Sequence, residues 1–269
     1  MSFFLVVDQI FDRVLLRQNR KRFAKVFSDF NFLHVEIANK IIESVSFINR
    51  NFDSILEIGA RNGYLGQEIA LQKNSKNLVQ TEICEANFEN FLKNKVIADD
   101  EFLPFKPESF DLIVSSLNFH HINLVPQFLL QVKELLKKDG IFIAAFFGEE
   151  NLSELVDIIF KTESELYGGI SPRTMPTIEV KTAANLLQKA GFKNSISDFE
   201  KFEVDYKYPL KLLQDLQKMG QANILHQRSR KFFNRKFLNQ FCQNYREKYE
   251  QEDKTVKATF EIVSVIGWK

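Results

Sequence analysis

The chain has 269 residues, of which 45% are hydrophobic and 26% charged, a composition typical of folded globular proteins and unlike that of disordered or fibrous ones. Its 36 basic and 35 acidic residues nearly balance, so there is no excess positive charge to hold a phosphate backbone, and nucleic acid is not an expected partner. Cys84 and Cys242 lie far apart and complete no zinc motif, so we expect free thiols and a cytoplasmic location.

The first 50 residues are predicted to form an N-terminal helical extension. Between residues 13 and 49, apolar side chains recur at helical spacings of three and four. The apolar run over residues 1–7 is too short to span a membrane and has neither a basic flank nor a cleavage site. We therefore expect no signal peptide and no transmembrane segment.

Residues 51–148 alternate short apolar runs with longer amphipathic stretches, the pattern of a parallel sheet with crossover helices. Five successive βα units imply a doubly wound core. The predicted strands are 55–58, 78–82, 96–98, 112–116 and 141–146. The predicted helices between them are 64–71, 86–92 and 124–136.

Residues 149–269 are expected to complete this core and to add a cap. Helices are predicted over 152–166 and 182–190, and strands over 194–199 and 258–267. The mostly helical stretch 209–249 lies between those two strands, so it must be an insertion. Its apolar stripe is expected to form the interior of the cap and comprises Leu212, Leu213, Leu216 and Met219.

A glycine-containing loop follows the first predicted strand, in the sequence LEIGARNG over residues 56–63. Gly59 lets the backbone approach a ligand closely, Gly63 lets helix and strand pack tightly, and the helix N-terminus offers free N–H groups. Open α/β sheets bind ligands at the carboxyl ends of their strands. The loop therefore favours a charged, nucleoside-bearing cofactor, although such turns also need glycine for steric reasons alone.

Acidic residues follow the next two strands. Glu82 lies 19 residues beyond Gly63, where a carboxylate can accept hydrogen bonds from both hydroxyls of a ribose. After the third strand, we expect Asp99 to meet an adenine amino group and Asp100 and Glu101 to face water. The alternative for each is a solvated surface carboxylate.

His120 and His121 follow the fourth strand, where either could accept a proton near neutral pH. The alternative of histidines that pack against the cap stays open. The sequence contains no Ser-His-Asp order, no phosphate-binding GxxxxGK[ST] loop and no recognisable zinc or iron motif, so no metal is expected.

Together these residues resemble the class I S-adenosylmethionine-dependent methyltransferases, particularly their BioC-like branch. The matching features are ExGxxxG at 57–63, Glu82, DDEFLPF at 99–105, and FDLIVSS at 110–116 with its following histidines. The resemblance implies a Rossmann-like, seven-stranded α/β sandwich with N-terminal helices, a helical cap inserted near the C-terminus, and S-adenosylmethionine as cofactor. It implies catalytic roles for His120 and His121 and cofactor contacts from Glu57, Gly59, Ala60, Arg61, Gly63, Glu82, Ile83, Asp99, Asp100 and Ser116.

Further segments resemble the mitochondrial complex I assembly factors of this fold, which are of the arginine-hydroxylase type. They are FDR at 11–13, GGISP at 168–172, LQDLQKMG at 213–220 and IGWK at 266–269. The main hypothesis is a methyltransferase acting on a small molecule or protein under the cap. The resemblance also implies an alternative, hydroxylation of an arginine on an iron–sulfur subunit of NADH dehydrogenase, and a third hypothesis is a non-catalytic binding module.

Arg61 departs from the family pattern, because a glycine usually occupies the middle of this loop. Its side chain could crowd the amino-acid portion of the cofactor and weaken binding. Alternatively, its guanidinium could bond the cofactor carboxylate and preserve binding. The sequence leaves both open.

Overall fold

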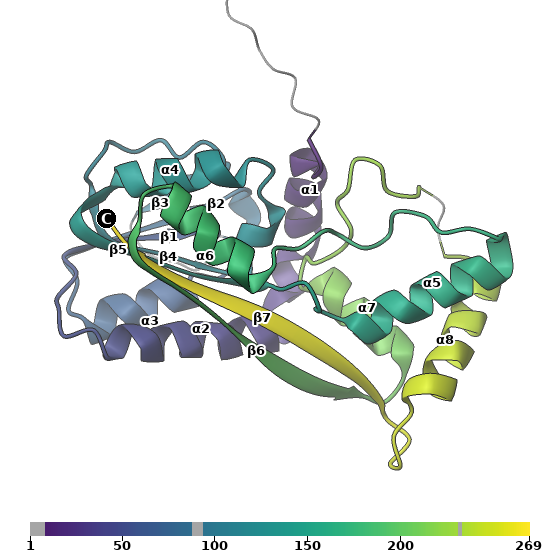
Figure 1. The fold of residues 1–269 in the computed structure, drawn as a ribbon. Helices are drawn as coiled ribbons and strands as arrows, with labels where there is room; N and C mark the ends of the chain where they lie inside the picture. The colour runs from purple at the N-terminus through teal and green to yellow at the C-terminus, as the bar shows by residue number, and fades with distance from the viewer. Residues whose placement is uncertain (1–8, 88–93, 231–232) are drawn as a thin grey trace, which may run out of the picture.

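The computed structural model describes residues 9–87, 94–230 and 233–269. Seven strands form one sheet in the order β3-β2-β1-β4-β5-β7-β6 (Figure 1). Only β7 runs antiparallel to its neighbours, β5 and β6. The seven-stranded sandwich expected from the resemblance is thereby confirmed. The strands are β1 (Ser54–Ile58), β2 (Asn77–Glu82), β3 (Lys95–Ile97), β4 (Phe110–Ser116), β5 (Leu136–Phe147), β6 (Lys193–Tyr206) and β7 (Val256–Trp268).

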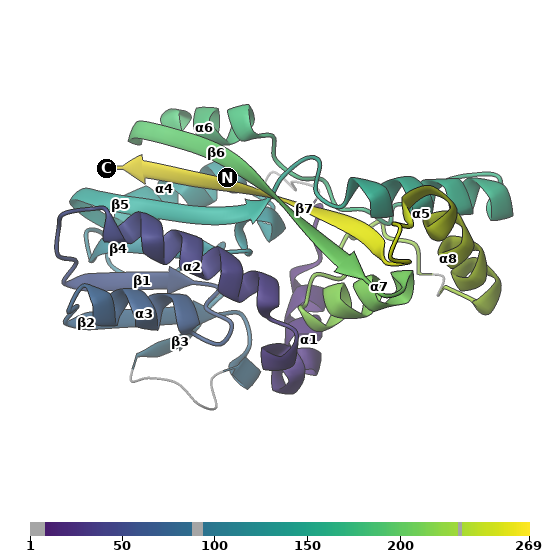
Figure 2. The same ribbon diagram turned by 90° about the horizontal axis from the view of Figure 1, so that it is seen from below.

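Helices cover both faces of the sheet, which is why the central strands are continuously apolar. Helices α2 (Phe32–Ser46) and α3 (Tyr64–Gln72) lie on one face, and α4 (Val125–Leu135) and α6 (Val180–Lys189) on the other (Figures 1 and 2). Each face has its own hydrophobic cluster. All five residues of β1 are buried, so the loop that follows β1 leaves from a rigid position.

The N-terminal extension is helical, as predicted, and it covers the carboxyl edge of the sheet. Helix α1 (Arg13–Phe23) is followed by a 3₁₀ segment, Ala24–Asp29, and then by α2. Figure 2 shows α1 across the ends of the strands, between the sheet and the cap. The extension therefore lies at the edge of the sheet where the candidate site residues are expected.

The cap consists of α5 (Ser153–Tyr167), α7 (Pro209–Lys218) and α8 (Arg235–Tyr249), beyond the carboxyl edge of the sheet (Figure 1). Helices α7 and α8 come from the predicted insertion between the last two strands, and α5 packs against α8. In the predicted stripe, Leu212, Leu216 and Met219 are buried. Strand β6 runs seven residues past its predicted end at residue 199, reaching the cap.

Strand β5 and the segment predicted as a helix over 86–92 differ from the expectations from sequence. Strand β5 begins at Leu136 instead of residue 141, because α4 passes directly into it. The predicted turn at Asp139, with a φ of 59°, forms an irregularity within the strand and does not precede it. Of the helix predicted over 86–92, only a 3₁₀ turn at Glu85–Asn87 is seen, and residues 88–93 lie outside the described part of the chain. In that described part, no helix has the length and apolar character needed to cross a membrane.

Candidate active site

The glycine loop joins β1 to α3 and has the backbone conformation that its glycines predict. Gly59 and Gly63 have φ values of 69° and 77°, in the left-handed region that favours glycine. A Cβ atom at Gly59 would overlap the Asn118 side chain, and one at Gly63 would lie 2.8 Å from the Gln80 side chain. Both glycines are therefore required by the packing itself.

Glu57 lies beneath this loop and ties its two ends together. Its Oε2 atom accepts hydrogen bonds from the Gly66 backbone N–H at 3.1 Å and from Gln80 Nε2 at 2.6 Å. Burial raises the pKa of Glu57 to about 7, although both hydrogen bonds act in the opposite direction. Burial therefore favours the protonated form of Glu57 more than solvent does.

Glu82, at the end of β2, is fully buried and already holds several donors. Its Oε1 accepts from Arg20 Nη1 at 2.8 Å and from the Ile83 N–H at 3.0 Å, and its Oε2 accepts from the Arg61 N–H at 3.0 Å. Burial acts to raise the pKa of Glu82, but the Arg20 and Arg61 guanidiniums outweigh it and hold that pKa below its ordinary value. Arg20 also donates to Asn118 Oδ1.

Arg13 binds both aspartates after β3. Its Nη2 donates to Asp99 at 2.7 Å and to Asp100 at 2.8 Å, and its Nη1 donates to the His121 carbonyl at 3.1 Å. The expectation that Asp100 faces water is wrong, because Arg13 holds it in a site with no exposed surface. Glu101 is half-buried and accepts from the Asn123 N–H, so it too is engaged.

Sequence reasoning missed the roles of Arg13 and Arg20. Their spacing of seven residues places them on one face of a helix, which was the available signal. Their role becomes visible only in the folded structure, where both arginines reach the carboxylates at the ends of β2 and β3. Asn118 and Gln221 were missed too, because nothing local distinguishes them from other polar loop residues.

The two histidines occupy different environments. His120 lines a large cavity, and its Nε2 lies 3.0 Å from Gln221 Oε1. Because Gln221 Nε2 donates to the Leu117 carbonyl, its Oε1 is the acceptor, and His120 therefore carries its proton on Nε2 and keeps Nδ1 as an acceptor. Burial lowers the pKa of His120 to about 4, so the ring is neutral at pH 7. His121 is buried against the edge of the Phe11 ring and does not line the cavity.

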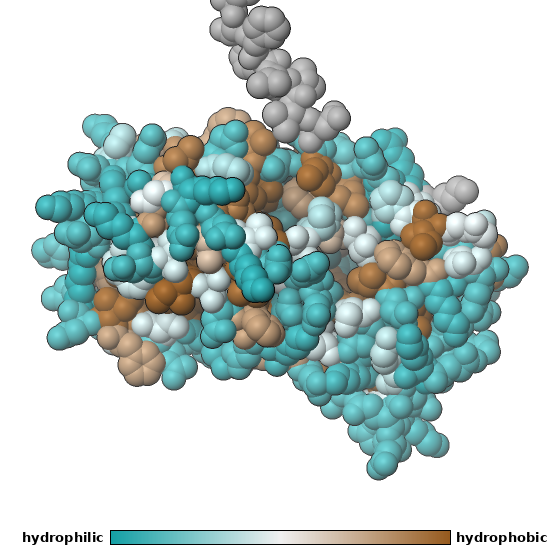
Figure 3. Space-filling model, in the orientation of Figure 1, coloured by the Kyte–Doolittle hydropathy of each residue, from teal (hydrophilic) through white to brown (hydrophobic). Residues whose placement is uncertain are grey.

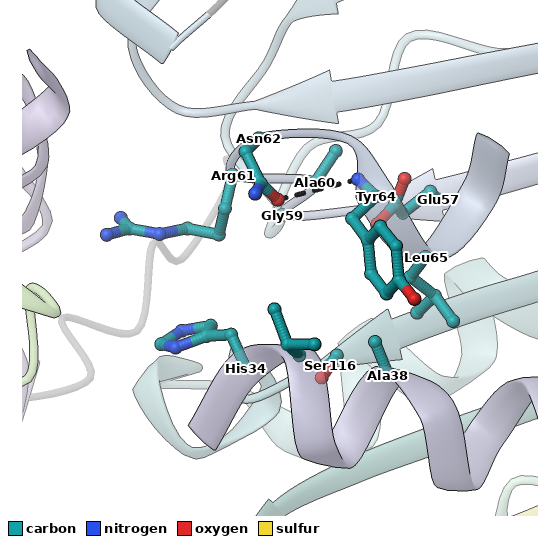
Figure 4. A pocket seen from close by; sticks show the side chains of 11 residues that line it. His34, Ala38, Glu57, Gly59, Ala60, Arg61, Asn62, Tyr64, Leu65 and Ser116 are labelled. Carbon is teal, nitrogen blue, oxygen red and sulfur yellow. Dashed lines mark hydrogen bonds between the residues drawn. The ribbon is translucent and has the colours of Figure 1, made fainter. Parts of the chain in front are cut away.

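Two cavities meet this edge of the sheet. The smaller, of about 20 Å³, lies against the glycine loop and is lined by His34, Glu57, Arg61 and Ser116, among others (Figure 4). The larger, of about 700 Å³, lies between the sheet edge and the cap, with Phe147, Leu155, Arg173 and Leu213 in its wall. Figure 3 shows apolar side chains between the core and the cap on the face in view.

Comparison with known proteins assigns the fold and the family. A methyltransferase domain model matches residues 56–144, which include the glycine loop and Glu82. The mitochondrial arginine-hydroxylase NDUFAF5 of Homo sapiens is 37% identical over 267 residues, covering 97% of this chain and 77% of that protein. The chain belongs to the NDUFAF5 family. Malonyl-[acyl-carrier protein] O-methyltransferase 1 of Coxiella burnetii is 23% identical over 89% of the chain and 82% of its own length, in agreement with the BioC-like resemblance.

Solved structures place this NDUFAF5-family member in the class I methyltransferase fold. The YcgJ protein of Bacillus subtilis superposes with a TM-score of 0.60 at 14% identity, over 86% of the chain and 97% of that protein. The phosphoethanolamine N-methyltransferase 2 of Haemonchus contortus, solved with S-adenosylhomocysteine, gives a TM-score of 0.50 at 13% identity, over 86% of the chain and 52% of that protein.

The residues of this family member suit the cofactor that the fold implies. Several buried polar atoms beside the loop have no hydrogen-bond partner, which is costly unless a ligand satisfies them. They are Nε of Arg20, Nε and Nη1 of Arg61, Oδ1 of Asp100, Oγ of Ser116 and Nδ2 of Asn118. Unused donors suit a carboxylate, and unused acceptors suit hydroxyl and amino groups. The small cavity has room for about one water molecule, so a cofactor needs side chains here to move aside.

Proposed function

We propose that this chain binds S-adenosylmethionine and modifies an arginine side chain of a protein, and that the modification is the hydroxylation for which its relatives are named. The observation that carries the proposal is the 37% identity across 97% of the chain, which includes the cap as well as the sheet. Because the cap forms the outer wall of the large cavity, the relationship extends to the residues that would meet the substrate.

For the cofactor, we assign contacts from the loop, from the ends of β2 and β3 and from the end of β4. Glu82 would accept the ribose hydroxyls, Asp99 and Asp100 the adenine amino group, and Ile83 would cover the ring. The loop backbone at Gly59, Ala60 and Gly63 would approach the rest of the cofactor, with Ser116 and Glu57 nearby. When bound, the cofactor offers an activated methyl group. Glu82 Oε1 already accepts two hydrogen bonds, so full use of this carboxylate requires Arg20 to withdraw.

For the substrate, the large cavity offers what an arginine side chain needs. Glu149 in its wall supplies a carboxylate for a guanidinium, and Gln214, Gln217 and Asn223 supply amide oxygens. Phe147 provides an aromatic face on which a guanidinium can stack, whereas the Phe233 ring already packs against Arg173 and Phe237. The wall cations are neutralised, since Arg173 pairs with Glu163 and Arg228 with Asp12, so a positively charged substrate is not excluded.

His120 is the side chain that we assign to proton transfer. It lines this cavity as a neutral ring with Nδ1 as its acceptor atom. The Phe147 N–H, 3.5 Å from Nδ1, holds that atom only weakly. A substrate proton could therefore be accepted there without breaking a strong bond. His121 is assigned a packing role.

The test is mass spectrometry of a protein substrate. We expect an arginine of an NADH dehydrogenase iron–sulfur subunit to gain one oxygen atom when incubated with this protein, S-adenosylmethionine, dioxygen and a reductant. Gain of a methyl group at the same residue would instead establish methyl transfer, the second candidate, which the methyltransferase domain match favours. If the subunit stays unmodified and calorimetry detects no cofactor binding, the hypothesis of a non-catalytic binding module is the one that remains.

The partner follows from the same proposal, and the compartment does not. We propose that the chain acts during the assembly of NADH dehydrogenase, as the resemblance to complex I assembly factors implies. The cytoplasmic location expected from the cysteines stays a prediction, because the relative at 37% identity is named as mitochondrial.

A further inference from the structure

Arg61 occupies a backbone position that disfavours it. Its φ of 54° lies in the left-handed region, which a residue with a Cβ atom enters at a cost, and glycine would adopt it freely. Its side chain is nevertheless only 5% exposed. Neither the loop conformation nor solvation of the guanidinium explains an arginine at this point.

The Arg61 guanidinium is also short of partners. Its Nη2 donates to the Met219 carbonyl at 2.9 Å, and its Cζ lies 4.2 Å from the centroid of the Phe27 ring. Its Nε and Nη1 have no hydrogen-bond partner. Within residues 9–87, 94–230 and 233–269, no carboxylate lies within 4.0 Å of this group. A buried arginine normally has such a carboxylate, because an unpaired buried charge is costly.

Arg20 makes the local charge imbalance larger. Glu82 is the shared anion between Arg20 and Arg61, and it forms its ion pair with Arg20. Burial, together with the nearby Arg20 charge, lowers the pKa of Arg61 to about 9. The Nε atom of Arg20 is unpartnered as well. Two guanidiniums thus offer three unused donors in a buried site that holds one carboxylate between them.

Of the two arginines, Arg61 lies in the wall of the small cavity beside the glycine loop and Arg20 does not. Arg61 lines that cavity together with His34, Gly59 and Ser116. In Figure 4 the Arg61 side chain leaves the loop towards the end of the cavity where His34 lies, away from Tyr64 and Leu65. Both His34 nitrogens are unpartnered, and burial lowers the pKa of His34, so this ring adds no charge. The group that fits these unpartnered donors is a small anion.

We infer that Arg61 binds the carboxylate of the cofactor's amino-acid portion, with Arg20 beside it. The inference rests on the proposed function, since it takes the ligand to be S-adenosylmethionine. It resolves the two alternatives that the sequence left open: the side chain at the middle position of the loop adds a binding group instead of crowding the ligand. A carboxylate is an anionic acceptor, and its oxygens can take charge-assisted hydrogen bonds from the unpartnered donors of Arg61.

The experiment measures Kd by calorimetry for two ligands that differ by one group. S-adenosylhomocysteine carries the carboxylate, and its decarboxylated analogue lacks only that group. We expect Arg61→Gln to weaken binding of S-adenosylhomocysteine by about 10- to 100-fold and to change binding of the analogue less than about twofold. Arg50→Gln, which removes an arginine near the start of β4, is the matched control and should change neither Kd.

Each outcome has one meaning. Equal effects of Arg61→Gln on both ligands, or no effect on either, would overturn the inference while leaving the cofactor site intact. Tighter binding of S-adenosylhomocysteine by Arg61→Gly would show that the side chain crowds the ligand, and would overturn it too. If Arg61→Gln does not fold, Arg61→Lys keeps a charge without the planar fork, and the same selective loss is expected of it. Failure of the unmodified protein to bind either ligand would refute the proposed cofactor, and with it this inference.

Discussion

Arg20 of α1 and Glu82 of β2 form an ion pair of 2.8 Å between side chains that are 1% and 0% exposed. The pair connects the N-terminal helix to the carboxylate that would hold the ribose. Because α1 precedes the methyltransferase domain match, which begins at residue 56, this contact joins the extension to the core. The extension is thus part of the proposed cofactor site.

Removing Arg20 should cost much of the stability. Arg20→Met would leave the Glu82 charge buried without its partner, and we expect a loss of about 3–5 kcal/mol in the free energy of unfolding, measured by urea titration. The double variant Arg20→Met, Glu82→Gln should regain a large part of that loss. If the double variant is as unstable as the single one, packing around Arg20 matters more than its charge.

Glu57 should make the stability depend on pH between its unfolded and folded pKa values. Its pKa rises on folding from 4.5 to about 7, so the folded state binds the proton more tightly than the unfolded state. The stabilisation that the folded state gains from the tighter proton binding at Glu57 is fully present below pH 4.5 and is lost as the pH rises towards 7. At about 1.4 kcal/mol per pKa unit, the decline amounts to about 3 kcal/mol. In Glu57→Gln, urea titrations across this range should lack the decline, and an unchanged decline would assign it to another group.

His120 should not titrate in the physiological range. With a pKa of about 4, the ring is already neutral at pH 5, so kcat/KM for the protein substrate should show no His120 inflection between pH 5 and 8. His120→Gln should lower kcat by about 10²- to 10⁴-fold, the range typical of a lost general base, while the Kd of S-adenosylhomocysteine changes little. An inflection near pH 6.5 that disappears in His120→Gln would contradict the neutral ring.

The large cavity should admit the substrate and not the cofactor. Leu213→Trp places a bulkier side chain in its wall, and we expect KM for the protein substrate to rise by about tenfold or more with cofactor Kd unchanged. Leu130→Trp is the matched control, because Leu130 is 49% exposed on α4, on a different element from the cavity wall. Similar effects of both substitutions would show that the cavity is not the entry route.

The layout of the sheet, and the edge at which a ligand is proposed to bind, could be predicted from the sequence alone. Apolar runs located the first five strands, because strands buried on both faces, such as β1, must be almost wholly apolar. The last two were located by a turn signal and by alternation, and β6 is largely exposed along its length. Glu57, Gly59, Gly63 and Glu82 could be assigned from their places after strands, since parallel topology brings those ends to one edge.

Only the tertiary structure decided what those residues meet. Asp100 was expected in water and is buried, because Arg13 reaches it from a helix 87 residues earlier in the chain. The role of Arg61 could be inferred only from its surroundings, in which no carboxylate forms an ion pair with its guanidinium. Local periodicity fixes the face on which a side chain lies, whereas burial, charge pairing and pKa depend on contacts between distant segments, which no local pattern encodes.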